Sequence, residues 1–514
     1  MRRLRRSISL MKPISAYLTP FLKLAPGLIL LLGLLSCTHP RTPSDTITPD
    51  GTLGSLTPDA QTTAGTPARP TRAPTSTATR TPIPTITAPV STLDVQSEDL
   101  SGLAITFWHP WGGEQGALLQ DILDEFNRTN RWDITVEVTA FEGLDRLEEA
   151  VDAALIAGNL PDLLAAYNYQ ALHWDASGTV LVDLNEYAGD PTWGLSADEQ
   201  ADFLPAFWDQ DIASRAGASP RRLGVPLHRS AVVLYYNQSY AWSLGFSNRP
   251  ATPYDLRVRA CAAAEANASD GQSGNDGTGG WLITPQPSLL VGWIYAFGGE
   301  FVRLDGRGYQ FNTTETAQAL DYLKGLQDSG CAWQAAGSNP AVELAARRAL
   351  FYVGSLSELP AVQAAFDAAG SQDSWIVLPF PGADGSPVLV TYGPSLMITR
   401  SEPEQELAAW LALEWLVYPP NQAQWVAASY LLPVRQSTLG FLSESISANP
   451  HWAAALELLP AARSEPAYAS WGVMRWALND AMAELFTPAF TAGQIPDLLE
   501  ALDQAALEIF NQVR

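Results

Sequence analysis

The sequence predicts an α/β fold made of more than one lobe. Short apolar runs alternate with helical patterns from about residue 100 to the C-terminus, as they do in layered α/β proteins. The chain has 514 residues, which is too long for one ordinary core. Hydrophobic residues make up 46% of it, so most of its length can be buried.

The first elements follow one another closely. An apolar strand at 103–108 leads through a polar, Gly-containing turn at 109–116 into residues 117–129, whose apolar side chains recur at helical spacing. The pattern then predicts a strand at 134–141, a helix at 144–157 and a short buried strand at 162–167.

The later elements continue this alternation. Residues 232–236 form a continuous β-branched and aromatic run, which predicts a buried strand. The Gly-rich stretch 270–280 is expected to be a loop. Because it does not follow a strand into a helix, it is no dinucleotide cradle. Further strands are expected at 349–353, 375–378 and 388–398, and long helices at 404–418 and 496–513.

The N-terminus has the pattern of an export signal. Residues 1–36 contain six basic side chains and no acid, and the apolar run 28–35 is too short to span a bilayer. The run ends in Leu34-Leu35-Ser36-Cys37, which resembles a bacterial lipobox with an unusually large residue at Leu35. We expect cleavage before Cys37 and lipidation there, which would hold the chain at the outer face of the cytoplasmic membrane or the cell surface. The alternative is a plain signal peptide.

Residues 37–99 are expected to be a stalk. Thr, Pro, Ser and Ala dominate them, so they cannot bury enough apolar surface to fold, and repeated proline keeps such a chain extended. The folded part therefore starts at about residue 100. The formal net charge of −24 repels phosphate backbones, which argues against nucleic acid as a partner.

Three cysteines are present. If Cys37 carries lipid, Cys261 and Cys331 remain in an oxidising compartment and can form one disulfide. The sequence leaves a second possibility open, namely two buried free thiols, because spacing does not show whether the two residues meet.

The motifs of several enzyme classes are missing. No HExxH, paired CxxC, P-loop or GxSxG sequence occurs, and the five histidines are scattered without metal-ligand spacing. We therefore expect no metal and no cofactor. A pair of catalytic carboxylates would be needed for sugar hydrolysis, and nothing selects one among the 54 acids.

Five segments stand out in order along the chain. The first is ITFWHPWGGEQGALLQDILDEFNRTN, and the others are GVPLHRSAVVLYYNQSY, ALFYVGS, VTYGPSLMI and YLLPVRQST. In this order they resemble segments of the extracellular solute-binding proteins of ABC sugar importers. The resemblance covers most of 100–514 and implies a type II periplasmic-binding fold, with two lobes joined by crossing hinge strands. It places lobe one at about 103–230 and 350–397, and lobe two at about 231–349 and 398–514.

The resemblance also implies a function. A monomeric binding protein would capture a small solute between its lobes and deliver it to permease subunits by hinge closure, without chemistry. Near the C-terminus, relatives that bind glycerol 3-phosphate carry a cation where this chain has Ser470 and Trp471. This difference favours a neutral carbohydrate, with Arg475 as a complication. The alternatives are a glycerol 3-phosphate binder, a sugar-processing enzyme and a sensor.

Candidate ligand contacts in the first lobe lie in three loops. Each has a second interpretation: Trp111 is a platform or a packed side chain, His109 a contact or a turn residue, and Asp145 a contact or an acid at a helix start. The full set for these loops is Trp108, His109, Trp111, Asp145, Tyr167 and Asn168.

Further contacts are implied in the crossings and in the second lobe. Aromatic rings would stack on sugar faces, while small and polar residues would approach hydroxyl groups. Of Tyr235 and Tyr236, which alternate on a strand, only one can face the ligand. Arg435 either pairs with an acid in the cleft or supports a turn. The set is Arg229, Ser230, Tyr236, Trp281, Trp293, Gly354, Ser355, Tyr392, Gly393, Arg435 and Trp471.

Overall fold

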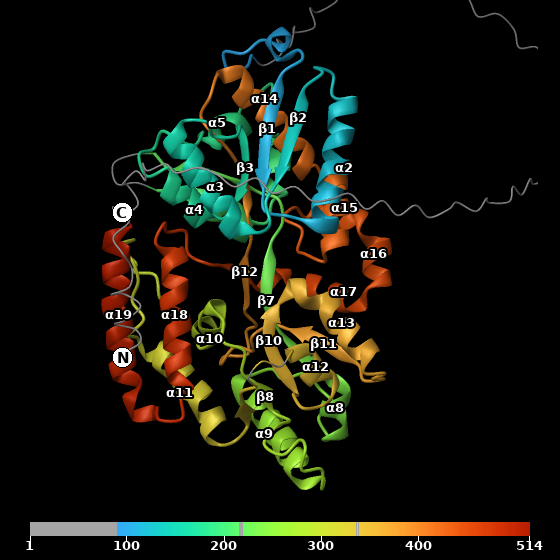
Figure 1. Ribbon diagram of the computed structural model, residues 1–514, viewed down its shortest axis with the longest axis vertical. Coiled ribbons are helices and arrows are strands. Elements are labelled where there is room, and N and C mark those ends of the chain that lie inside the picture. The colour runs from blue at the N-terminus through green and yellow to red at the C-terminus, as the bar shows by residue number, and fades with distance from the viewer. Residues whose placement is uncertain (1–89, 215–218, 336, 338, 514) are drawn as a thin grey trace, which may run out of the picture. The chain divides into compact units, whose positions relative to one another are not determined.

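The computed structural model describes residues 90–214, 219–335, 337 and 339–513. The expected signal peptide, Cys37 and most of the expected stalk lie outside these residues. The described residues fall in one of two units of the chain, and Figure 1 shows their helices and strands. No helix among them is both long and apolar enough to cross a membrane.

The first lobe is built on a five-stranded sheet. Its strand order is β2-β1-β3-β13-β6, with β1 parallel to β2 and β3, and β13 antiparallel to β3 and β6. The strands are Ala104–His109 (β1), Thr135–Ala140 (β2), Leu163–Ala166 (β3), Val225–Pro226 (β6) and Ser395–Ile398 (β13).

Helices on both sides cover this sheet. The amphipathic helix α2 (Gly113–Thr129) buries Leu119, Ile122, Leu123 and Phe126, which is the pattern expected from its helical spacing. The helices α14 (Pro403–Val417) and α15 (Pro419–Ser429) pack on α2. The remaining helices of this lobe are α3 (Leu144–Ala157), α4 (Asn168–Trp174), α5 (Leu184–Ala188), α6 (Ala197–Ala201) and α7 (Pro205–Trp208). A short hairpin, β4 (Ile212–Ala213) with β5 (Arg221–Arg222), completes the set.

The second lobe is built on a larger sheet around β7. Strands β10, β11 and β12 all pair antiparallel with β7, and β14 lies parallel beside β12. The strands are Ser230–Asn237 (β7), Trp281–Leu282 (β8), Ala332–Trp333 (β9), Phe351–Ser355 (β10), Trp375–Leu378 (β11), Leu389–Tyr392 (β12) and Ala462–Ser464 (β14).

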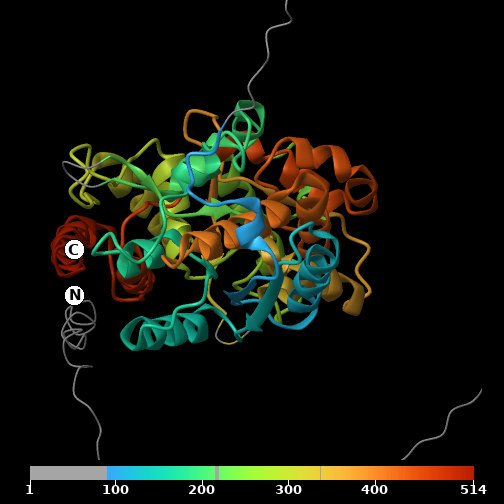
Figure 2. The ribbon, with the colours of Figure 1, turned by 90° about the horizontal axis from the view of Figure 1, so that it is seen from above.

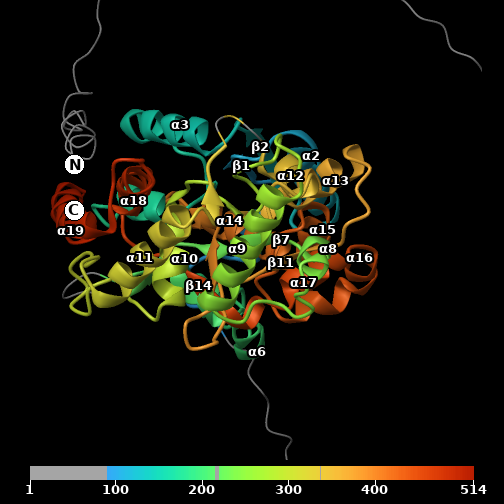
Figure 3. The ribbon, with the colours of Figure 1, turned by 90° about the horizontal axis from the view of Figure 1, so that it is seen from below.

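The helices of the second lobe lie around this sheet, as Figure 3 shows from below. Among them α18 packs against α10 and α19, and α17 packs against β11. They are α8 (Gln238–Ser243), α9 (Pro253–Ser269), α10 (Pro287–Ala296), α11 (Thr314–Asp328), α12 (Pro340–Ala345), α13 (Leu359–Ala368), α16 (Ser443–Ala448), α17 (Pro450–Leu456), α18 (Trp471–Leu485) and α19 (Ile495–Gln512).

The two-lobed α/β fold is confirmed, but the expected lobe boundaries are wrong in two places. Strands β10, β11 and β12 pair with β7, so residues 351–392 belong to the second lobe. The helices α14 and α15 pack on α2 and belong to the first lobe. The single strand expected at 388–398 is two strands, because the chain passes from one sheet to the other at Gly393-Pro394. Lobe membership depends on pairing partners far apart in the sequence, which local patterns do not encode.

The end of the expected stalk is also corrected. Residues 90–99 are attached to the first lobe, where Val95 is buried and Ser91 and Thr92 bind the Asp190 carboxylate. The hydroxyl of Ser91 and the backbone N–H of Thr92 donate to Oδ2 of Asp190 over 2.9 and 2.7 Å. Burial alone would raise the pKa of Asp190, but backbone N–H groups, first those of Thr192 and Trp193, lower it to about 2.

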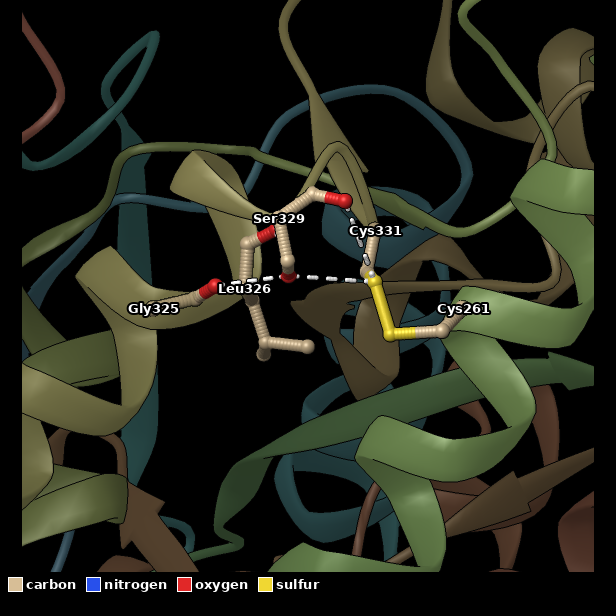
Figure 4. Close-up of a disulfide and its surroundings, with 5 residues drawn as sticks. All are labelled: Cys261, Gly325, Leu326, Ser329 and Cys331. Carbon is tan, nitrogen blue, oxygen red and sulfur yellow. Dashed lines mark hydrogen bonds between the residues drawn. A yellow bond between two sulfur atoms is a disulfide. The ribbon is translucent and has the colours of Figure 1, made fainter.

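Cys261 and Cys331 form a disulfide with a Cα–Cα distance of 4.3 Å (Figure 4). It joins α9 to the residue before β9, and the hydroxyl of Ser329 lies 3.1 Å from the Sγ of Cys331. Of the two possibilities left open by the sequence, the structure therefore shows the bridge. It closes 70 residues of the second lobe into a loop, which lowers the entropy of the unfolded chain.

Candidate functional site

The ends of several strands meet where the two lobes face each other. Tyr167 follows β3 in the first lobe, while Ser355, Tyr392 and Glu465 stand at or just after the ends of β10, β12 and β14. Because β10 and β12 run antiparallel to β7, their ends lie beside Ser230 at its start. We call the following set the inter-lobe cluster: Tyr167, Tyr169, Ser230, Ser355, Tyr392, Glu465 and Arg475.

The hydroxyl groups of this cluster are linked. The phenol of Tyr392 donates to the Oγ of Ser355 over 2.7 Å, and Ser230 and Ser355 share a hydrogen bond of 3.2 Å. The rings of Tyr167 and Tyr169 stack with centroids 5.4 Å apart. Burial raises the pKa of Tyr169 to about 12, and it raises those of Tyr167 and Tyr392 as well. All three phenols therefore stay uncharged and can both donate and accept hydrogen bonds.

One ion pair accompanies the tyrosines. The carboxylate of buried Glu465 accepts from Nη1 of Arg475 over 2.7 Å, from the indole N–H of Trp471 over 2.8 Å and from the hydroxyl of Ser288 over 2.5 Å. The guanidinium of Arg475 lies 5.8 Å from the centre of the Tyr392 ring. The charge of Arg475 is thus balanced within the cluster, and a neutral, hydrogen-bonding surface results.

The lobes touch beside this cluster. A Cβ placed on Gly472 of α18 would lie 2.8 Å from the ring of Tyr169 in α4, so only glycine permits this approach. The side chain of Gln210 in the first lobe donates to the carbonyl oxygen of Glu465 over 3.4 Å. Figure 1 shows α4 and α18 on the same side of β7.

Four expected site residues lie in this cluster and two lie next to it. Tyr167, Ser230, Ser355 and Tyr392 are members. Asn168 donates to the carbonyl oxygen of Gln210, and exposed Asp145 in the first turn of α3 acts electrostatically on Tyr169. Their roles as ligand contacts remain proposals.

The residues of the first strand–helix turn pack inside the first lobe instead. The Trp111 indole is 9% exposed and lies against His109, His228 and Trp425, with ring centroids 4.9 to 5.6 Å apart. We call these four residues the buried Trp/His cluster. Of the two interpretations of Trp111, packing is therefore the one that the structure shows. Trp108 packs on Phe141 with ring centroids 5.3 Å apart.

The two histidines of the buried Trp/His cluster are neutral. Burial lowers the pKa of His109 to about 4 and that of His228 to about 3. The Nδ1 of His109 accepts from the backbone N–H of Trp111, as expected of a turn residue, and the Nδ1 of His228 accepts from the Trp425 indole. No hydrogen-bond partner is seen for the buried Nε2 of His109.

Four aromatic residues expected at the ligand belong to the core of the second lobe. Trp281, Trp293 and Trp471 have no exposed surface and Tyr236 has 1%, so these expectations are corrected. For Trp293 the sequence held a usable signal. The run LLVGWIYA is apolar on every face of its helix, and such a helix is buried all round.

Arg229 and the two expected glycines stabilise the crossings. The fully buried guanidinium of Arg229 donates to the carbonyl oxygen of Pro394, to Ser395 and to Asp211, and thereby joins the outward and return crossings. A Cβ on Gly393 would lie 3.0 Å from the carbonyl oxygen of His228, and one on Gly354 would lie 2.8 Å from Glu358. These glycines permit close packing within the protein, and their expected approach to a ligand remains a proposal.

Arg435 also has a structural partner. Its Nε donates to Asp202 over 2.8 Å inside the first lobe, where the Arg435 side chain is 5% exposed. The turn-supporting interpretation is therefore correct. The described part of the chain holds no group of three or more histidine, cysteine, aspartate or glutamate side chains suited to a metal ion.

Sequence reasoning missed two residues beside the lobe contact. Tyr169 follows Tyr167 by two positions, and Trp476 lies four residues after Gly472, on the face of α18 that meets α4. Trp476 is 69% exposed. The polar neighbours Arg475, Asn479 and Asp480 distinguish this tryptophan from those in apolar runs, and they could have indicated its exposure.

The family model for bacterial extracellular solute-binding proteins matches residues 121–454, well over half of the chain. The chain belongs to this family. Membership in this family confirms solute capture as the function class. A comparison with curated proteins finds no match in sequence.

Solved structures of solute-binding proteins share the fold. The cyclic α-maltosyl-1,6-maltose binding protein from Arthrobacter globiformis is 19% identical with a TM-score of 0.67, over 80% of this chain and 99% of that one. The sugar-binding protein MalE from Xanthomonas citri is 19% identical with a TM-score of 0.67, over 79% and 97%. UgpB from Mycobacterium tuberculosis, in complex with glycerophosphocholine, is 20% identical with a TM-score of 0.61, over 79% and 98%.

Proposed function

We propose that this solute-binding protein captures a neutral mono- or oligosaccharide between its lobes and delivers it to the permease of an ABC importer. The observation that carries the proposal is the composition of the inter-lobe cluster. Three uncharged phenols, two serine hydroxyls and one balanced ion pair surround the point where the lobes meet. Phenol rings stack on the C–H faces of sugars, while hydroxyl and carboxylate groups bond their edges.

The charge of the cluster favours a sugar over a phosphate ester. A phosphate ligand needs cationic donors that are free to meet it, whereas Arg475 is already paired with Glu465. Glycerol 3-phosphate remains the second candidate, because the Arg475 side chain keeps 24% of its surface exposed. The glycerophosphocholine bound by the Mycobacterium tuberculosis protein supports keeping this alternative.

Lobe closure would convert binding into a signal. The chain passes between lobes at Arg229-Ser230 and at Gly393-Pro394, and Arg229 holds these crossings together through Pro394 and Ser395. A ligand that contacts Tyr167 on one side and Tyr392 on the other stabilises the closed arrangement by its differential affinity. The permease would then recognise the closed form.

The location follows from the same proposal. Cleavage before Cys37 and lipidation there would place a monomer at the outer face of the cytoplasmic membrane or the cell surface. A tethered receptor stays at high effective concentration near its permease. Palmitate labelling of the full chain in its host, with Cys37→Ala as the control, tests the anchor.

Calorimetry with glucose, maltose, maltotriose and sn-glycerol 3-phosphate tests the ligand class. We expect saturable 1:1 binding of a sugar without product formation, and Tyr167→Ala should weaken it at least tenfold. Stabilisation by glycerol 3-phosphate alone would contradict the carbohydrate proposal, and release of sugar products would show an enzyme. If the protein binds a ligand but the loaded form causes no transport in membranes that contain the permease, a sensor would be favoured instead.

A further inference from the structure

A second pocket opens away from the inter-lobe cluster. It measures about 460 Å³, within the range of small-molecule sites. One wall is the exposed face of α13 with Gln363 and Asp367. The opposite wall comprises Tyr430, Asn449 and His451.

The pocket lies on the other side of the hinge. Figures 1 and 3 show α18 on one side of β7, and α13, α16 and α17 on the other. Tyr430 stands at the end of α15, two residues before Leu432, whose backbone exchanges two hydrogen bonds with Arg229 at the first crossing. One wall belongs to α13 of the second lobe. The other joins Tyr430, which ends the first-lobe helix α15, to Asn449 and His451 of the second lobe.

The side chains around the pocket combine flat rings with neutral hydrogen-bonding groups and one carboxylate, that of Asp367. The imidazole of His451 stacks on the buried Trp375 indole at 3.6 Å, and burial lowers the pKa of His451, which favours its uncharged form. The amide of Gln363 donates to Asp367 over 2.9 Å and leaves its own oxygen available as an acceptor. The lining contains no lysine or arginine.

The backbone of Tyr430 adds a further sign of function. Its φ is +54°, in the left-handed region that a bulky residue rarely adopts. Such strain persists where surrounding contacts impose it, and it is concentrated at ligand sites and hinges. The indole N–H of Trp452 donates to the carbonyl oxygen of the next residue, Leu431, and holds this turn against α17.

We propose that this pocket is a second ligand site, which takes a small uncharged molecule rich in hydroxyl groups. Ring faces of His451 and Tyr430 cover its apolar side, while Gln363, Asp367 and Asn449 bind its hydroxyls. The pocket joins Tyr430 of the first lobe to second-lobe residues while Gly472 touches Tyr169 on the far side of the hinge. A ligand that contacts both Tyr430 and α13 would hold this arrangement, and as part of the same proposal we expect it to raise the affinity of the inter-lobe site.

Fluorine NMR of the full chain labelled with 5-fluorotryptophan tests this proposal. Trp375→Phe identifies the signal beneath the pocket, and Trp476→Phe identifies the signal beside the inter-lobe cluster. The probes are glycerol, myo-inositol and D-glucose, with sn-glycerol 3-phosphate as the anionic comparison. We expect at least one uncharged probe to shift the Trp375 signal saturably and the anion to leave it unmoved.

Three substitutions on the exposed face of α13, one of them a control, locate the effect. Ala364→Trp fills the pocket and should weaken the Trp375 response at least tenfold. Ala361→Trp is the matched control, since Ala361 is exposed on the same helix but does not line the pocket. Gln363→Ala, which alters no buried group, should weaken the response about threefold, a change of roughly 0.6 kcal/mol.

The outcomes separate the two sites. An equal Trp375 response in Ala364→Trp and the unchanged chain overturns the second site, as does a Trp375 signal that no uncharged probe moves. Failure of the inter-lobe proposal appears instead as a Trp476 signal that no sugar shifts. If an uncharged probe bound at the pocket leaves sugar affinity at the inter-lobe site unchanged, the coupling to closure is wrong.

Discussion

Two groups of aromatic side chains in this protein look alike in sequence and differ in the structure. The buried Trp/His cluster joins Trp111 to Trp425 and two neutral histidines inside the first lobe. The inter-lobe cluster places Tyr167, Tyr169 and Tyr392 between the lobes, with part of each side chain exposed. Figure 2, seen from above, shows blue first-lobe segments beside orange helices, in agreement with the packing of α14 and α15 on α2.

The difference teaches what separates a platform from a packed ring. Trp111 follows β1 by two residues, at the carboxyl end of a parallel strand, yet Trp425 of α15 covers it from a region about 300 residues later in the chain. Tyr167 lies at the equivalent end of β3, and there the second lobe meets its neighbour Tyr169 at Gly472, which has no side chain to cover the ring. A position at the end of a strand therefore does not by itself make an aromatic ring a ligand contact. The segment that packs over the ring determines whether it stays accessible.

The largest expected effect is on stability in the buried Trp/His cluster. Trp111→Ala should lower the free energy of unfolding by about 3–5 kcal/mol, because it leaves a cavity among three rings. Denaturant unfolding measures this loss, and the folded fraction should keep its ligand affinity. Trp242→Ala is the control, since the Trp242 indole is 49% exposed and its loss should cost within about 0.5 kcal/mol. If Trp111→Ala lost ligand affinity while its stability stayed unchanged, Trp111 would be a ligand contact and not a packed side chain.

The next effect concerns binding beside the inter-lobe cluster. Trp476→Ala should weaken sugar affinity about tenfold, or 1.4 kcal/mol, because the exposed indole loses a stacking surface. Its stability should change by less than about 0.5 kcal/mol. Calorimetry and thermal unfolding of the same preparation measure both. Unaltered affinity would remove Trp476 from the site, and Trp242→Ala again gives the baseline.

A change of pH should affect the two clusters differently. His109 and His228 have folded pKa values of about 4 and 3, below the ordinary 6.5, so the unfolded chain binds more protons in this window. Their contribution to stability is present above pH 6.5 and is lost as the pH falls toward 4, by at most about 1.4 kcal/mol per pH unit for each. The phenols of the inter-lobe cluster stay uncharged throughout.

Unfolding between pH 7.5 and 5.5 measures that slope. His109→Asn should reduce it, whereas the same change at exposed His173 should leave it as it is. If the free energy of unfolding still depends on pH in the same way after both buried histidines are replaced, other groups cause the acid sensitivity.

The smallest effect distinguishes two phenols that bind the same serine. Tyr392 donates to the side chain of Ser355, while buried Tyr235 donates to its carbonyl oxygen over 2.7 Å. Tyr392→Phe should weaken sugar affinity by about 0.5–1 kcal/mol, and Tyr235→Phe should lower stability by a similar amount with affinity unchanged. If both variants changed affinity and stability in the same way, the assignment of Tyr392 to the site and of Tyr235 to the core would be wrong.

Most helices and strands, and the fold class, could be predicted from the sequence. The pairing of the strands could be predicted less well. Strands near β1, β3, β7 and β10 and the long helices were identified from periodicity, since these patterns are local. The pairing of β10 with β7 joins residues more than a hundred positions apart, and no local pattern encodes it. Local patterns also could not show whether Cys261 and Cys331 form a disulfide, because the two residues are 70 positions apart.

The candidate site was predicted in part for the same reason. Tyr167, Ser230, Ser355 and Tyr392 were identified through resemblance, and they meet because four strand ends converge. Glu465 sits in no motif, and only its contacts with Ser288, Trp471 and Arg475 reveal it. Trp281 and Trp293 misled because tryptophan serves cores and ligand surfaces equally well.

The attachment of residues 90–99 to Asp190 joins the N-terminal segment to the first lobe and not to the second. The chain leaves toward its N-terminus from the first lobe, at a carboxylate gripped by Ser91 and Thr92. If the proposed anchor at Cys37 is present, the connection to the membrane reaches the folded part through the first lobe. Closure would then move the second lobe relative to the point of attachment.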